Sequence, residues 1–328
     1  MRTRAFGSTG ITASEVGFGL WTISTGWWGE HSDESAIALL REAYDLGITL
    51  YDTADTYGEG RGETLLAKAL GDVRDDITIA TKFGYDIYSP WERKGHVERP
   101  HDWSPEYIRY ALDQSLARLA TDRIDVYQLH NPRMAAIRSD EVFAVLDEAV
   151  SAGKIGTYAV ALGPAIGWRE EGIEAFTTRD LGAAQIIHNL LEQDPGRELI
   201  EIAREESIGL MIRVPHSSGM LEGKYTKDTV FGENDHRRHR PKEWLTEGLR
   251  KVDQLGFLTE GRTLGQAAIQ WLLAEPSVTT VLPNIYDSAQ LREFAAAPDT
   301  PPLSAAELDR VAELYASDFA VAAATTGA

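Results

Sequence analysis

The chain has 328 residues, contains no cysteine and carries a formal net charge of −19 at pH 7. The missing cysteines exclude disulfides, thiolate catalysis and cysteine-bound zinc. The acidic excess argues against nucleic acid or an anionic membrane as a partner. The first residues lack an apolar signal core, and no apolar run approaches the roughly 18 residues of a membrane span. We therefore expect a cytoplasmic protein without a membrane partner.

The chain begins with two short arms around a Gly/Ser/Thr turn at residues 4–14, which predict a β-hairpin. Short apolar runs then alternate with amphipathic segments that carry helix start signals such as Ser32 and the Ser104-Pro105 pair. The expected strands are residues 16–21, 48–52, 77–82, 124–129, 155–162, 184–189, 210–214 and 278–282. The expected helices are residues 33–46, 63–70, 105–119, 140–152, 170–176, 196–207, 244–255, 264–274, 288–295 and 304–315.

This alternation predicts an α/β fold with parallel strands joined by helical crossovers. Eight such units over roughly 300 residues fit a closed (β/α)8 TIM barrel better than an open sheet. No Pro-rich or Ser-rich linker divides the chain, so we expect a single domain over residues 1–328. Two long loops, residues 83–103 and 215–241, are expected to set substrate specificity.

Polar side chains stand at the ends of three consecutive expected strands. Asp52 ends the second strand, and Tyr57 follows five residues later. Lys82 ends the third strand and His130 follows the fourth. Each residue alone has a structural explanation, such as a turn cap, a surface lysine or a core histidine. Because a barrel builds its active site at the C-terminal ends of its strands, the joint placement favours a catalytic site.

The chemistry that suits these four residues is proton transfer coupled to carbonyl reduction. A phenol alone is a weak acid at neutral pH, and an adjacent ammonium stabilises its phenolate form. Asp52 can pair with Lys82, because an unpaired buried ammonium tends to lose its proton. His130 can donate a hydrogen bond to a substrate oxygen beside Tyr57. Tyr57 would then be the general acid in reduction and the general base in oxidation, with the hydride supplied by a cofactor.

The sequence resembles the aldo-keto reductase superfamily over nearly its whole length. The resemblance is carried by residues 52–58 (DTADTYG), 81–84 (TKFG) and 121–130 (TDRIDVYQLH), and further by residues 6–10, 221–225 and 271–273. It implies a TIM barrel whose N-terminal hairpin caps the barrel bottom, with Asp52, Tyr57, Lys82 and His130 as the catalytic tetrad. It also implies a nicotinamide dinucleotide, usually NADPH, bound across the barrel mouth. Consistent with this mode of binding, no G-x-G-x-x-G and no P-loop joins a strand to a helix.

The resemblance further implies a set of cofactor contacts: Gly19, Trp21, Asp52, Gln185, Arg213, Pro215, Ser217, Gly219, Leu221, Leu282, Asn284 and Gln290. The residues expected around the nicotinamide depart from the family in two places. Ala161-Leu162 replaces a Ser-Asn pair that holds the carboxamide, and Arg213 replaces an aromatic residue that stacks on the nicotinamide. A guanidinium there would disfavour the cationic oxidised ring, or would instead bind an anionic or polyhydroxy substrate.

The stretch expected to hold the 2′-phosphate departs from the family as well. Tyr286 and Asp287 stand where cations are expected, which leaves Arg292 as a candidate partner for the phosphate. We therefore expect NADP as the cofactor, with NAD as the alternative.

The leading functional hypothesis is a reductase of an aldehyde, a ketone or a sugar-like carbonyl. The alternatives are a sugar or polyol dehydrogenase, a non-redox lyase or isomerase that reuses the tetrad, and a cofactor-sensing regulatory subunit. His130, His188 and His216 raise the question of zinc, but we expect no metal and interpret the last two as polar lining of the pocket. Trp27, Trp28, Trp91 and Trp103 suit either a substrate or the core, and residues 237–240 are interpreted as a solvated basic run. The sequence leaves the substrate, the reaction direction and the oligomeric state open.

Overall fold

The structure is a computed structural model that describes residues 1–26, 29, 31–92, 97–232, 235, 237 and 240–320. In this part of the chain, eight parallel strands form one sheet in chain order. Its two end strands meet through a parallel bridge between Val16 and Val281, where the Val281 amide donates to the Glu15 carbonyl at 2.9 Å. The strands are β3 (Phe18–Gly19), β4 (Leu50–Asp52), β5 (Thr78–Phe83), β6 (Ile124–His130), β7 (Ile155–Ala161), β8 (Ala183–Ile187), β9 (Gly209–Arg213) and β10 (Val278–Leu282). The predicted TIM barrel is therefore confirmed.

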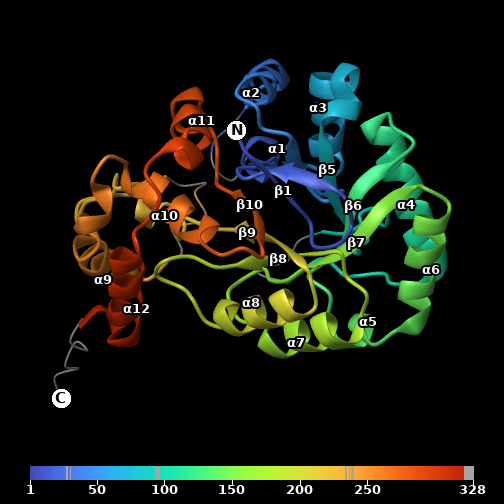
Figure 1. The fold of residues 1–328 in the computed structure, drawn as a ribbon. Helices are drawn as coiled ribbons and strands as arrows, with labels where there is room; N and C mark the ends of the chain where they lie inside the picture. The colour runs from blue at the N-terminus through green and yellow to red at the C-terminus, as the bar shows by residue number, and fades with distance from the viewer. Residues whose placement is uncertain are drawn as a thin grey trace.

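Helices surround this barrel on the outside (Figure 1). They are α1 (Trp21–Thr25), α2 (Asp33–Asp45), α3 (Arg61–Leu70), α4 (Pro105–Leu119), α5 (Met134–Ile137), α6 (Asp140–Ser151), α7 (Arg169–Thr178), α8 (Gly196–Glu205), α9 (Lys242–Asp253), α10 (Leu264–Leu273), α11 (Ser288–Ala295) and α12 (Ala305–Ala316). The predicted N-cap residues Ser32 and Ser104 each accept a hydrogen bond from the backbone amide three residues further along the chain. In the part of the chain that the structure describes, no helix is both long and apolar enough to cross a membrane.

The expected strand over residues 16–21 was too long. Leu20 donates its amide to the Asp52 carbonyl at 2.8 Å and ends the pairing with β4, and Trp21 then begins the short helix α1. Gly26 ends this helix in a left-handed conformation, which only glycine adopts without strain. The helix α5 was not predicted, because four residues are too few to show a periodic pattern.

The N-terminal hairpin consists of β1 (Thr3–Ala5) and β2 (Thr12–Ser14), paired antiparallel as predicted. Phe6, at its turn, and Ala13 are fully buried and pack against side chains inside the barrel. The turn must pass close to the barrel, since a Cβ at Gly7 would lie 1.8 Å from the Ser207 carbonyl oxygen. The hairpin thus closes one end of the barrel, as the resemblance implied.

The barrel interior is built in layers because side chains on a strand alternate between its two faces. One buried layer contains Leu50, Ala80, Val126, Ala159, Ala183 and Met211. Two residues further along the same strands stand Asp52, Lys82, Gln128, Ala161, Gln185 and Arg213. A polar layer therefore lies above the apolar one, at the C-terminal ends of the strands.

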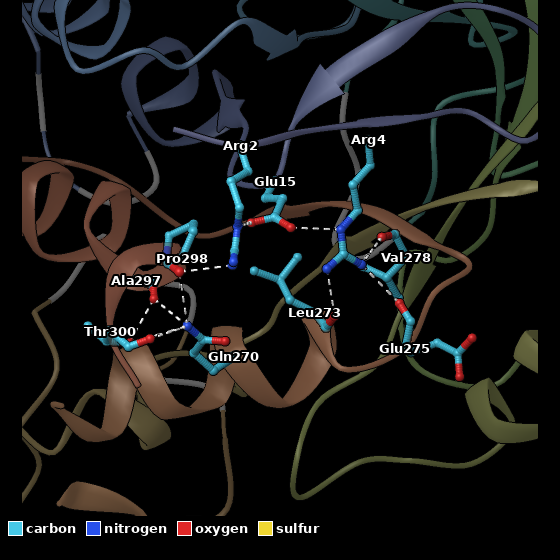
Figure 2. A network of polar contacts seen from close by, with 10 residues as sticks. All are labelled: Arg2, Arg4, Glu15, Gln270, Leu273, Glu275, Val278, Ala297, Pro298 and Thr300. Carbon is cyan, nitrogen blue, oxygen red and sulfur yellow. Dashed lines mark hydrogen bonds and ion pairs between the residues drawn. The ribbon is translucent and has the colours of Figure 1, made fainter. Parts of the chain in front are cut away.

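A polar network ties the hairpin to the C-terminal half of the chain (Figure 2). The Arg4 guanidinium donates to the Glu15 carboxylate at 2.8 Å and to the backbone carbonyls of Leu273, Glu275 and Val278 at 2.7–3.2 Å. Two of these carbonyls lie at or just beyond the end of α10, where helix carbonyls lack intrahelical partners. Arg2 donates to the other Glu15 oxygen at 2.9 Å, and Glu15 itself is buried.

We expect Arg4→Met to lower the free energy of unfolding by roughly 2–4 kcal/mol, because a buried carboxylate loses a partner and three carbonyls lose a donor. Arg2→Met is the matched control, since the Arg2 side chain is 60% exposed and makes fewer of these bonds. Its loss should be below about 1 kcal/mol. Urea unfolding of the three proteins measures both values. Equal losses in the two variants would contradict the role given to Arg4.

Candidate active site

The four residues predicted as a tetrad lie together at the C-terminal end of the barrel. The Lys82 ammonium is 1% exposed and donates to Asp52 Oδ2 at 2.7 Å, to the Thr53 carbonyl at 2.7 Å and to Tyr57 Oη at 3.3 Å. All three of its hydrogens are thereby used. The His130 ring lies edge-on to Tyr57, with 6.0 Å between the ring centroids. Their roles in catalysis stay a prediction, but their proximity is a property of the fold.

Two side-chain amides hold the Asp52 carboxylate from the side opposite Lys82. Gln128 and Gln185 each donate to Asp52 Oδ1 at 2.9 Å, and Gln185 also donates to Gln128 Oε1 at 3.3 Å. Gln128 was missed in the sequence, although it stands two residues before His130 on the same face of β6. Gln185 was expected to contact the cofactor; its side-chain amide hydrogens are directed at Asp52 and Gln128, and a contact through its oxygen stays a prediction.

Opposing effects act on the pKa of Lys82. Burial lowers it, but Asp52 and Tyr57 beside the ammonium outweigh burial and raise the pKa above its usual value. Burial lowers the pKa of His130 well below its usual value, and the charges of Lys82 and Arg213 lower it further. The histidine is therefore neutral at pH 7, and its Nδ1 is buried with no partner among the described residues. A neutral imidazole beside Tyr57 can donate one hydrogen bond without adding charge.

A cavity of about 540 Å³ opens above the tetrad. Among the residues predicted to bind a cofactor, it is lined by Gly19, Trp21, Asp52, Gln185, Arg213, Leu282 and Asn284. The sequence did not single out several other residues of its wall, including Tyr85, Asn131, Glu192 and Ser218. Tyr85 accepts a hydrogen bond from Asn131 Nδ2 at 2.7 Å and lies edge-on to His130.

The other predicted cofactor residues, Pro215, Ser217, Gly219, Leu221 and Gln290, do not line this cavity. Ser217 donates to Glu192 at 3.1 Å, and Gln290 donates to Glu222 at 2.8 Å. Leu221 packs in an apolar cluster under α10. Their contact with a cofactor stays a prediction.

The cations near α11 already have acidic partners. Arg292, the predicted phosphate partner, donates to Glu42 at 2.7 Å, and Lys224 lies 3.4 Å from Glu222. Asp287 caps α11 by accepting from the Gln290 amide. Both of these cations, Arg292 and Lys224, would therefore have to leave an acidic partner in order to bind a 2′-phosphate.

His188 and His216 are not pocket lining, contrary to our expectation. His188 stacks on Trp271, while the Nε2 of His216 lies 3.0 Å from the Gly265 carbonyl oxygen. Both are buried, and burial lowers the pKa of each to about 4. Among the described residues, no group of histidines and carboxylates is arranged to hold a metal ion.

The tryptophans and the basic run have separate positions. Trp91 lines a second, open cavity next to the first, and Trp103 packs on Phe83. Arg237 pairs with Asp235, whereas Arg240 reaches the wall of the first cavity. Trp27, Trp28, Arg238 and His239 lie outside the described residues.

Comparison with known proteins identifies the family. The aldo-keto reductase YhdN of Bacillus subtilis (strain 168) is 31% identical over 308 residues, which cover 90% of this chain and 88% of YhdN. The NADH-specific methylglyoxal reductase of Escherichia coli (strain K12) is 30% identical over 318 residues, covering 90% and 93%. The solved structure of a glycerol dehydrogenase from Gluconobacter oxydans is similar, with a TM-score of 0.82 at 25% identity and coverage of 99% and 98%. The family model for aldo/keto reductases matches residues 15–316, and the chain therefore belongs to the aldo/keto reductase family of oxidoreductases.

Proposed function

We propose that this protein uses NAD(P)H to reduce the carbonyl of an aldehyde, a ketone or a sugar-like compound to an alcohol, with Tyr57 as the general acid. One observation carries the proposal: the buried Lys82 ammonium donates a hydrogen bond to Tyr57 Oη. Because Tyr57 accepts this bond, its own hydrogen is left to donate into the cavity. The adjacent cation stabilises the phenolate that forms when this hydrogen leaves.

The remaining tetrad residues support this proton transfer. Asp52 keeps Lys82 charged, since it balances the ammonium inside a desolvated site. Gln128 and Gln185 fix the Asp52 carboxylate by donating to its second oxygen. His130, held neutral, donates to the substrate carbonyl oxygen and positions it beside Tyr57 Oη. Tyr57 then protonates that oxygen as the carbonyl carbon is reduced.

The bound nicotinamide cofactor supplies the hydride for this reaction. The cavity fits such a group beside the tetrad. Apart from Gly19 itself and its two chain neighbours, no atom of the described residues lies within 4 Å of where a Cβ would stand on Gly19, so this part of the wall is open to a flat ring. Trp21, Leu282 and Asn284 would form the adjoining wall, and Pro215, Ser217, Gly219, Leu221 and Gln290 would hold the rest of the dinucleotide. NADP is the expected cofactor, with NAD as the alternative.

The relatives support a small carbonyl compound as the substrate. One is named a methylglyoxal reductase and is NADH-specific, and a structural neighbour is a glycerol dehydrogenase. The name glycerol dehydrogenase favours alcohol oxidation as an alternative direction of the reaction at the same site. A cytoplasmic location is part of the proposal, and it rests on the sequence alone.

Tyr57→Phe should lower kcat by roughly 10²–10⁴-fold, because the variant keeps the ring but has no proton to give. Steady-state oxidation of NADH and NADPH with a panel of aldehydes and ketones measures this loss. Tyr88→Phe is a suitable control. Tyr88 is a partly buried phenol that accepts a hydrogen bond from Arg118 and does not line the cavity. Full turnover by Tyr57→Phe would refute the role of Tyr57.

Lys82→Met should lower the free energy of unfolding by roughly 3–5 kcal/mol, because Asp52 is left as an uncompensated buried charge. Combining it with Asp52→Asn removes both charges and should recover most of this loss. The double variant should nevertheless stay at least about 100-fold less active than the wild type. Urea unfolding and turnover, measured on the same preparations, separate the two effects. Recovery of activity along with stability would show that the ion pair is only structural.

Tyr286→Arg should tighten NADPH binding roughly tenfold and leave NADH binding nearly unchanged, because only NADPH carries a 2′-phosphate to pair with the new guanidinium. Tyr286→Phe is the control and should affect both cofactors little. Fluorescence titration with each reduced cofactor gives the dissociation constants. An equal change in the dissociation constants of NADH and NADPH would show that the 2′-phosphate of NADPH does not lie near residue 286.

A further inference from the structure

Arg213 is a cation built into the wall of the catalytic cavity. It projects from the end of β9, and its Nη2 donates to the Leu162 carbonyl at 2.7 Å, just beyond the end of β7. Its guanidinium therefore reaches across the polar layer toward the strand beside His130. A Cβ at Gly163 would lie 1.7 Å from Arg213 Nη2, so the glycine makes room for this conformation. The chain thus fixes the guanidinium at the cavity.

Among the described residues, no carboxylate pairs with Arg213. In the part of the chain that the structure describes, its only hydrogen bond is to the Leu162 carbonyl, and its Nε is buried without a partner. The two acids in the cavity wall are already engaged. Asp52 pairs with Lys82, and Glu192 accepts from Asn189 at 2.8 Å and from Ser217. Burying an unpaired cation is costly, and an anion that enters the cavity would offset that cost.

Arg213 also faces the reacting groups. It lines the same cavity as Tyr57 and His130. Burial lowers the pKa of Arg213, and Tyr57 and Asp52 act in the opposite direction. A small molecule whose carbonyl oxygen lies at Tyr57 and His130 can therefore present a second group to Arg213.

We propose that Arg213 binds an anionic group of the substrate, so that the preferred substrates are carbonyl compounds that carry a carboxylate or a phosphate. This inference rests on the proposed carbonyl reduction and names the substrate class for it. The planar guanidinium suits both anions, because its parallel N–H donors match two oxygens of either group.

Matched substrate pairs test this proposal with the complete protein and NADH or NADPH. One pair is 4-carboxybenzaldehyde with 4-methylbenzaldehyde, and the other is glyceraldehyde 3-phosphate with glyceraldehyde. The pairs separate a carboxylate from a phosphate as the preferred anion. In the wild type, kcat/KM should favour the charged member of at least one pair. Arg213→Met should lower kcat/KM for that charged member roughly 10- to 100-fold and change the neutral member less than about threefold.

The control is Arg133→Met, which removes a positive charge from the same end of the barrel without touching the cavity wall. Arg133 pairs with Glu98 at 2.9 Å and stacks on Trp168. It should leave the preference for the charged member unchanged. Arg213→Lys keeps the charge but loses the planar fork, and it should retain part of the preference. Thermal unfolding of each variant checks that the fold is intact.

The outcomes distinguish this proposal from the proposed function. If Arg213→Met weakens both members of a pair equally and also weakens cofactor binding in a fluorescence titration, Arg213 is a cofactor residue and the proposal is wrong. The proposal is also wrong if Arg213→Met leaves the preference for the charged substrate unchanged. If the wild type reduces no carbonyl at all, the proposed function fails, and calorimetry with benzoate and with inorganic phosphate still tests the anion site. Binding of either probe that Arg213→Met abolishes supports the site, and no binding by the wild type overturns it.

Discussion

The buried ion pair between Lys82 and Asp52 is the constraint on which the catalytic end of the barrel depends. Two charges out of water are tolerated only when every donor and acceptor is satisfied. Here the three hydrogens of Lys82 have three acceptors, and both oxygens of Asp52 have donors. These partners come from three neighbouring strand ends, the loop after β4, and the more distant strand β8. The pair therefore requires the strands to be in register all the way across the barrel.

That requirement also explains how much the sequence could predict. Local signals were sufficient for the order and type of most elements, since helix caps and apolar runs are read over a few residues. They could not supply the particular contacts that close the barrel, such as the bridge between Val16 and Val281, or the bonds from Arg4 to the end of α10. Such contacts link segments more than 260 residues apart, and their partners are backbone carbonyls that any residue could provide. The residue types in the sequence therefore give no sign of these contacts.

The same distinction holds inside the candidate site. Asp52, Lys82 and His130 could be found because strand ends in a barrel converge, whatever the register. Gln128 could also have been found, because it stands two residues before His130 on the same face of β6 and two residues after Val126 of the apolar layer. The orientation of Gln185 could not, because an amide at a strand end can donate inward to Asp52 or outward to a ligand. His188 and His216 show the reverse error, since proximity to a strand end in sequence did not place them in the cavity.

Lys82 and Arg213 carry the same charge at this end of the barrel, but their surroundings differ. Lys82 has a permanent counter-charge in Asp52, and the pair as a whole adds little net charge to the site. Arg213 has a carbonyl oxygen as its only hydrogen-bond partner among the described residues, so its full positive charge is directed into a cavity of a protein with net charge −19. Since the acidic surface repels anions at long range and salt screens that repulsion beyond roughly 8–10 Å, selection for an anion has to come from contact inside the cavity. Under our proposal, the uncompensated guanidinium of Arg213 provides that contact, and its positive charge also helps to keep His130, the residue proposed to position the carbonyl, neutral.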